Sequence, residues 1–152
     1  MRILTFILIT TLAFTAGCGK PRPLSPRESF EALRIAYHKK DVDRVISLYS
    51  KDTITSYTEA IRLINGMSDD QRKKLFETNM IPAAEKITLS DFVRFHITAQ
   101  SGEGNDPVID AFNHIITSIS VNGKKAVVRT DNGVELLFVQ EGIFWHFSPE
   151  GR

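Results

Sequence analysis

The chain has 152 residues and a nearly balanced charge, with 19 basic and 18 acidic side chains. Proteins that bind nucleic acids or other polyanions carry a surplus of basic residues, so this balance argues against nucleic acid as a partner. The chain holds a single cysteine, which excludes a disulfide within it.

The first 17 residues have the pattern of an export signal. Arg2 gives a short positive start, and an uncharged, largely apolar run from Ile3 to Phe14 follows it. A membrane-spanning helix needs about 20 apolar residues, and this run is shorter. A run of this length after a positive start is typical of a secretory signal. We therefore predict that residues 1–17 are a signal peptide.

Two small residues and the cysteine come directly after this run, as Ala16, Gly17 and Cys18. The arrangement resembles the lipobox of bacterial lipoproteins, with Thr15 where that family usually has an aliphatic residue. The resemblance implies that Cys18 receives diacylglycerol, that a peptidase cuts before it, and that the new amine is acylated, with palmitate as a typical chain. The alternative is an ordinary signal peptide with an incidental cysteine, which predicts a secreted protein.

The predicted anchor makes a membrane the first expected partner. Gly19 follows Cys18, whereas an aspartate at that place favours retention in the inner membrane in the lipoprotein family. The resemblance therefore implies the periplasmic side of the outer membrane, where the host has one. Residues 18–24 include Pro21 and Pro23 and lack hydrophobic periodicity, which predicts an extended tether. Residues 25–152 are enough for a single domain with its own core.

Helical signals fill the first part of this predicted domain. Ser25-Pro26-Arg27-Glu28 is a capping box with proline at the first helical position, and the helix is expected to end near Lys39-Lys40. A third helix is predicted to stop at Gly66. Further helix starts are predicted at Asp41, at Ser68 and around Ser90, and Asp106-Pro107 is expected to start one more short turn.

From Ile115 the hydrophobic period changes to two. Ile115, Thr117, Ile119 and Val121 alternate with polar neighbours, which predicts a strand. Tight turns are predicted at Asn122-Gly123, Asp131-Asn132-Gly133 and Glu141-Gly142. The expected fold class is therefore α+β, with N-terminal helices packed on a C-terminal four-stranded antiparallel meander.

Several residues at both ends of this domain resemble the nuclear-transport-factor-2-like (cystatin-like) superfamily. They are Ser25-Pro26, Phe30, Leu33, Ala36, Lys40-Asp41, Leu48-Tyr49-Ser50 and, on the last strand, Trp145. The resemblance implies a curved sheet, a cone-shaped fold and a pocket between sheet and helices. Residues 65–110 depart from it by being longer and more helical. The superfamily holds enzymes, binders and dimerisation modules, so no particular activity follows.

Enzymes of that superfamily use an aspartate or histidine inside the cone as a general base. The candidates here are His96, His146, Asp91 and Asp110. A base needs burial or a charged neighbour to bring its pKa near working pH. Both histidines lie in apolar surroundings that are typical of hydrogen-bonded core or rim residues. His38 and His114 are expected to be exposed, and no metal-ligand spacing or cofactor motif is present in the sequence.

Three hypotheses on function follow. The first is a non-enzymatic, membrane-anchored module of the cell envelope that binds an envelope protein or an apolar ligand. Ten phenylalanines, three tyrosines and a tryptophan fit such an apolar surface, as well as a well-packed core. The second is a small enzyme acting on an apolar molecule, with His96 or His146 paired to Asp91 or Asp110. The third is an inhibitor-like lipoprotein that blocks an envelope partner.

Overall fold

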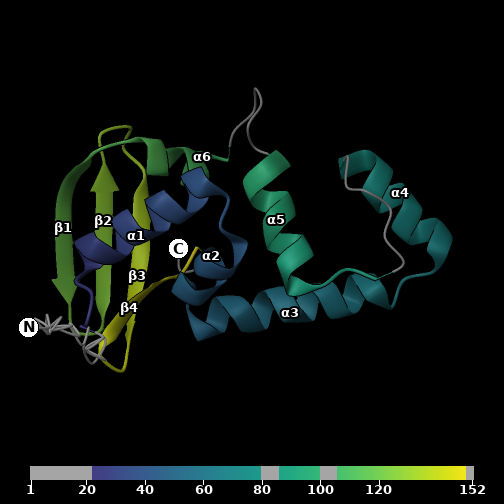
Figure 1. Ribbon diagram of the computed structural model, residues 1–152, viewed down its shortest axis with the longest axis horizontal. Coiled ribbons are helices and arrows are strands. Elements are labelled where there is room, and N and C mark those ends of the chain that lie inside the picture. The colour runs from purple at the N-terminus through teal and green to yellow at the C-terminus, as the bar shows by residue number, and fades with distance from the viewer. Residues whose placement is uncertain (1–21, 80–85, 100–105, 150–152) are drawn as a thin grey trace, which may run out of the picture.

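The computed structural model describes residues 22–79, 86–99 and 106–149, with the helices first and the strands last (Figure 1). The helices are α1 (Pro26–Lys39), α2 (Val42–Leu48), α3 (Lys51–Asn65), α4 (Asp69–Asn79), α5 (Leu89–Ala99), α6 (Pro107–Asp110) and the 3₁₀ turn η1 (Ala111–Asn113). The strands are β1 (Ile116–Asn122), β2 (Lys125–Thr130), β3 (Glu135–Glu141) and β4 (Phe144–Phe147). The predicted α+β fold is confirmed. Cys18 lies outside the described residues.

Side-chain caps explain where the first helices begin. The Ser25 hydroxyl accepts the backbone N–H of Glu28, and the Glu28 carboxylate accepts the backbone N–H of Ser25. Asp41 likewise accepts the backbone N–H of Arg44 at the start of α2. Each bond satisfies an N–H group that the helix itself leaves without a partner. Each cap joins two residues that are three positions apart in the sequence. Both predicted helix starts are confirmed.

The strands form one antiparallel sheet in the order β1-β2-β3-β4. Each of the three connecting turns contains a glycine at positive φ, namely Gly123, Gly133 and Gly142. Glycine adopts this conformation without a steric penalty, which is why these turns are readable from the sequence. The predicted meander is confirmed, and β3 is an internal strand.

The start of β1 differs from the predicted alternation. Ile116 pairs with Thr130, and the register shifts between Ile116 and Ser118. This β-bulge adds one residue to the strand, so that Ile116 and Ile119 both pack against the core. Ile115, expected on the same face as Ile119, is 66% exposed. A period-two pattern does not reveal where one residue is inserted.

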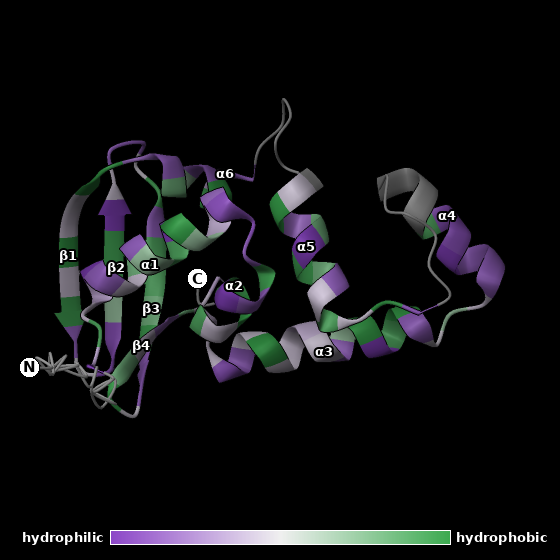
Figure 2. Ribbon diagram, viewed as in Figure 1, coloured by the Kyte–Doolittle hydropathy of each residue, from purple (hydrophilic) through white to green (hydrophobic). Residues whose placement is uncertain are grey.

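The helices form a layer on the sheet and an arm that leaves it. Contacts of α1 and α2 with β4, and of α1 with β2, form the layer. The helix α5 packs against both α2 and α3, and α3 carries the chain away from the sheet to α4 at the far end (Figure 1). Figure 2 shows that α4 is mostly hydrophilic, unlike the strands.

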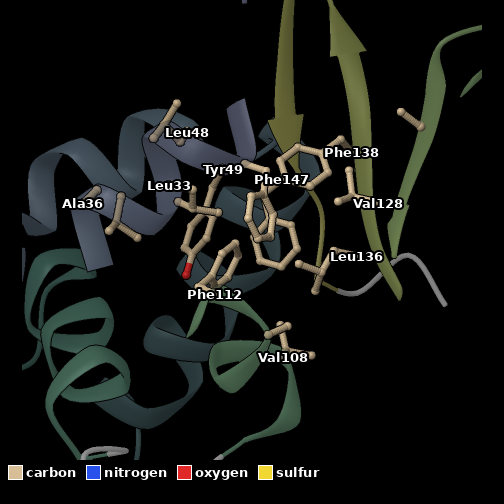
Figure 3. Packing of buried hydrophobic residues seen from close by; sticks show 14 of the residues in the cluster. Leu33, Ala36, Leu48, Tyr49, Val108, Phe112, Val128, Leu136, Phe138 and Phe147 are labelled. Carbon is tan, nitrogen blue, oxygen red and sulfur yellow. The ribbon is translucent and has the colours of Figure 1, made fainter. Parts of the chain in front are cut away.

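The main core lies between α1 and the sheet and is built on four fully buried rings (Figure 3). These are Phe30, Phe112, Phe138 and Phe147. The centroid of the Phe147 ring lies 5.5 Å from those of both Phe112 and Phe138. These rings pack the space between α1 and the sheet, and the superfamily resemblance, with the pocket that it implied, stays a prediction.

Candidate functional site

A hollow of about 500 Å³ opens beside β3, where β4 ends. We call it the β3 groove. Residues 133–137 form one wall, residues 147–149 form another, and Pro107 and Val108 at the start of α6 close one end. Val127 of β2 also lines it. Pockets of about 300–1,000 Å³ are the usual size of ligand sites, so this groove is the first candidate for binding.

The groove exists because β4 is shorter than β3. The last β3–β4 pair joins Phe138 to Phe147, and the N–H of Ser148 then donates to the carbonyl of Leu137 at 2.8 Å. Pro149 follows and has no N–H to continue the ladder. Glu135 pairs with β2 but lies beyond the last described residue that pairs from the β4 side. Among residues 106–149, the N-terminal part of β3 therefore presents a strand edge on this side.

Side chains from both faces of the sheet line the groove, because it wraps around this edge. Leu136 and Phe147 belong to the core face and are almost fully buried. Val127 and Leu137 are paired on the opposite face and are half-buried. The exposed Glu135 lies at the rim. The groove thus offers apolar walls beside a backbone edge, an arrangement suited to an extended chain with apolar side chains.

A polar group, the His114 cluster, lies next in the sequence to two segments that line the groove. Its residues 110 and 114 follow Val108, and its residues 131 and 132 precede Gly133. The Nδ1 atom of His114 lies 2.7 Å from Oδ1 of Asp131, and its Nε2 atom lies 3.2 Å from Oδ2 of Asp110. Asn132 donates to Asp110 at 3.3 Å. The side chain of His114 is 33% exposed, so it is less exposed than the sequence predicted.

The His114 cluster places the imidazole between two carboxylates. The Nδ1 atom faces Asp131 and the Nε2 atom faces Asp110, so the two acidic residues fix the orientation of the ring. The pKa of Asp110 is lowered, mainly by the hydrogen bond from Asn113 and also by Asn132 and His114. The four-residue spacing of Asp110 and His114 is a signal that the sequence reasoning missed. Their contact with Asp131 depends on the folded sheet.

Three tyrosines and His96 form a third cluster, where α1, α2, α3 and α5 meet. The hydroxyls of Tyr37 and Tyr49 are 2.5 Å apart, and the ring of Tyr57 packs edge-on against Tyr49. His96 stacks on Tyr57 with centroids 6.0 Å apart. Burial lowers the pKa of His96, and the negative charge of Asp106 partly opposes this effect. His96 therefore acts as a packed, uncharged ring.

The predicted histidine–aspartate pairs are not brought together. Asp91 accepts hydrogen bonds from Thr88 at the start of α5, which begins at Leu89, in agreement with the start predicted around Ser90. Asp110 is bonded to His114. Among the described residues, no hydrogen bond or ion pair joins His96 or His146 to either aspartate. His146 lies on β4, with a buried Nδ1 atom that has no partner in the described part of the chain.

Neither a metal site nor a membrane-spanning helix is found among the described residues. Within residues 22–79, 86–99 and 106–149, no three side chains are placed to hold a metal ion. None of the helices in these ranges is both long and apolar enough to cross a bilayer.

The chain matches no protein-family model, no curated protein and no solved structure.

Proposed function

We propose that this protein is a lipid-anchored, non-enzymatic module of the bacterial cell envelope that binds an extended segment of a partner protein in the β3 groove. The observation that carries the binding role is the strand edge at Glu135, which opens into a groove with apolar walls. The anchor is supported by the motif Ala16-Gly17-Cys18 after an apolar run.

The groove favours a peptide strand because β3 offers both backbone groups and apolar side chains along this edge. Backbone groups of an edge strand bind a peptide main chain, while adjoining apolar hollows take every second side chain. Leu136 and Leu137 point to opposite faces, so an added strand would meet an apolar wall on each side. Ser148 pairs with Leu137 where the strand edge begins, and the partner strand would continue along β3 from there.

The anchor is tested by metabolic labelling with radioactive palmitate in a bacterial host. The wild-type chain is expected to incorporate label and to fractionate with membranes. The variant Cys18→Ser is expected to do neither, because the thioether cannot form. Equal fractionation of both proteins, or no label in the wild type, would exclude the anchor.

The groove is tested by site-specific photo-crosslinking in cells. A photoreactive phenylalanine analogue is placed at Glu135, or at the exposed β1 position Ser120 as a control. We expect adducts from position 135 that map to one segment of a partner and disappear in Ser148→Trp, which fills the groove. The matched change Ser120→Trp should leave the adducts intact. The same adducts from both positions, or their survival in Ser148→Trp, would refute the groove as the binding site.

A further inference from the structure

Two hairpin turns and the start of α1 lie together at one end of the sheet. Figure 1 shows the β1–β2 and β3–β4 turns at the end where the chain enters α1, while the β2–β3 turn and α6 lie at the opposite end. We call the first the double-hairpin end and define it by Val121, Lys124, Lys125 and Ile143. The end is thus formed by segments that are far apart in the sequence.

The double-hairpin end exposes apolar side chains that the core does not use. Val121 and Ile143 are each 55% exposed, although they come from different hairpins. Val121 is one residue from the last β1–β2 pair, and Ile143 lies in the turn between β3 and β4. Single exposed apolar residues are ordinary on a protein surface. Here Val121 lies beside the turn of one hairpin, and Ile143 lies in the turn of the neighbouring hairpin.

The same end carries positive charge. Lys124 and Lys125 are exposed at the β1–β2 turn. Of two carboxylates at this end, Glu28 is paired with Arg22, whereas Glu141 accepts only the neutral backbone N–H of Lys51, and the two lysines outnumber this one carboxylate. Apolar tips flanked by lysines are the combination that binds the boundary between the headgroups and acyl chains of an anionic bilayer.

The length of the chain before α1 brings this end close to a membrane. Leu24 packs against the core, so the free tether is the stretch from Cys18 to Leu24. Six residues span at most about 20 Å when fully extended. A lipid on Cys18 therefore holds the start of α1 within about 20 Å of the bilayer.

We propose that the double-hairpin end docks on the bilayer, with Val121 and Ile143 at the headgroup boundary and Lys124 and Lys125 beside anionic headgroups. This inference rests on the proposed lipid anchor. Docking would turn the opposite end of the sheet away from the membrane. The β3 groove, whose wall begins at Gly133 in the β2–β3 turn, would then face an envelope partner.

The test uses the full-length lipidated protein in vesicles of phosphatidylethanolamine and phosphatidylglycerol that contain a nitroxide-labelled lipid as quencher. Because Cys18 is consumed by the anchor, an introduced cysteine is the sole free thiol for a fluorescent label. One protein carries Ile143→Cys. The control carries Ile115→Cys at the opposite end of the sheet, where the carbonyl of Ile115 accepts the backbone N–H of Asp131. Both replaced side chains are exposed, Ile143 by 55% and Ile115 by 66%.

We expect the label at position 143 to be quenched several-fold more strongly than the label at position 115. Reversing both charges in Lys124→Glu/Lys125→Glu should lower the ratio of docked to undocked protein by at least about fivefold per lysine. The control Lys73→Glu/Lys74→Glu makes the same charge change on α4, at the far end of the molecule, and should have little effect (Figure 1).

Equal quenching at positions 143 and 115, or equal effects of the two charge reversals, would overturn the docking surface while leaving the anchor in place. Sedimentation of the wild type with vesicles separates the two proposals. A wild-type protein that stays in the supernatant lacks the anchor, and the docking inference falls with it. A protein that sediments but shows equal quenching refutes only the docking inference.

Discussion

The hydroxyl oxygens of Tyr37 and Tyr49 lie 2.5 Å apart in a place where four helices meet. Burial raises the pKa of both phenols, so both hydroxyls keep their protons and one donates to the other. The ring of Tyr57 packs edge-on against the ring of Tyr49, with centroids 5.7 Å apart. Tyr49 therefore contacts Tyr37 through its hydroxyl and Tyr57 through its ring.

This bond predicts similar, non-additive effects for two equivalent substitutions. Tyr49→Phe and Tyr37→Phe each leave one buried hydroxyl without the other, so each should lower the free energy of unfolding by about 1–3 kcal/mol. The double variant removes both hydroxyls, so its loss should be smaller than the sum of the two single losses. Urea unfolding of the three variants measures the losses, and additive losses would contradict a direct bond between the two hydroxyls.

The surroundings of His96 predict a loss of stability in mild acid. Burial lowers the pKa of His96 in the folded protein, so the unfolded chain binds a proton more readily. The contribution of His96 is fully present above its unfolded pKa of about 6.5 and is lost as the pH falls below that value. His96→Gln should reduce this loss, measured as urea midpoints across the pH range. His38→Gln, at an exposed position, should retain it.

The sequence predicted best what depends on near neighbours. The cap of α1 at Ser25 and the turn at Gly133 each depend on the geometry of a few consecutive residues, and both are confirmed. The bulge at the start of β1 was missed because it depends on pairing with Thr130. Pairing partners are chosen by the whole sheet, and a local pattern carries little information about them.

The candidate site was harder to predict for the same reason. His114 meets Asp131 only because β1 and β2 fold back on each other, which brings together residues 17 apart. The β3 groove is defined by where β4 stops relative to β3, and its third wall comes from α6. Apolar runs predict the strands. They do not predict that, among the described residues, the pairing of β3 with β4 ends at Phe138 and Phe147.

Gly133 offers a test of backbone strain at the groove wall. Its φ is 83°, a region that residues with a Cβ rarely adopt. Gly133→Ala should therefore lower the free energy of unfolding by about 1–2 kcal/mol, although nothing lies near the added methyl group. Gly66 at the end of α3 has a negative φ of −85°, so Gly66→Ala should cost less. Thermal unfolding of both variants measures the difference, and equal losses would contradict the strain argument.

Phe112 links the core to the β3 groove and provides the most demanding test. Its ring stacks on Tyr37 at 4.9 Å and meets Phe147, a groove wall, edge-on at 5.5 Å. Phe112→Ala removes this support and should lower the free energy of unfolding by about 3–5 kcal/mol, because it leaves a cavity in a packed core.

The exposed control Ile35→Ala should change the free energy of unfolding by no more than about 0.5 kcal/mol. Because Phe147 loses a neighbour in Phe112→Ala, crosslinking from position 135 should also weaken under conditions where the variant is still folded. Circular dichroism establishes the folded state first. Unchanged crosslinking in a folded but destabilised variant would mean that the groove wall does not depend on the core behind it.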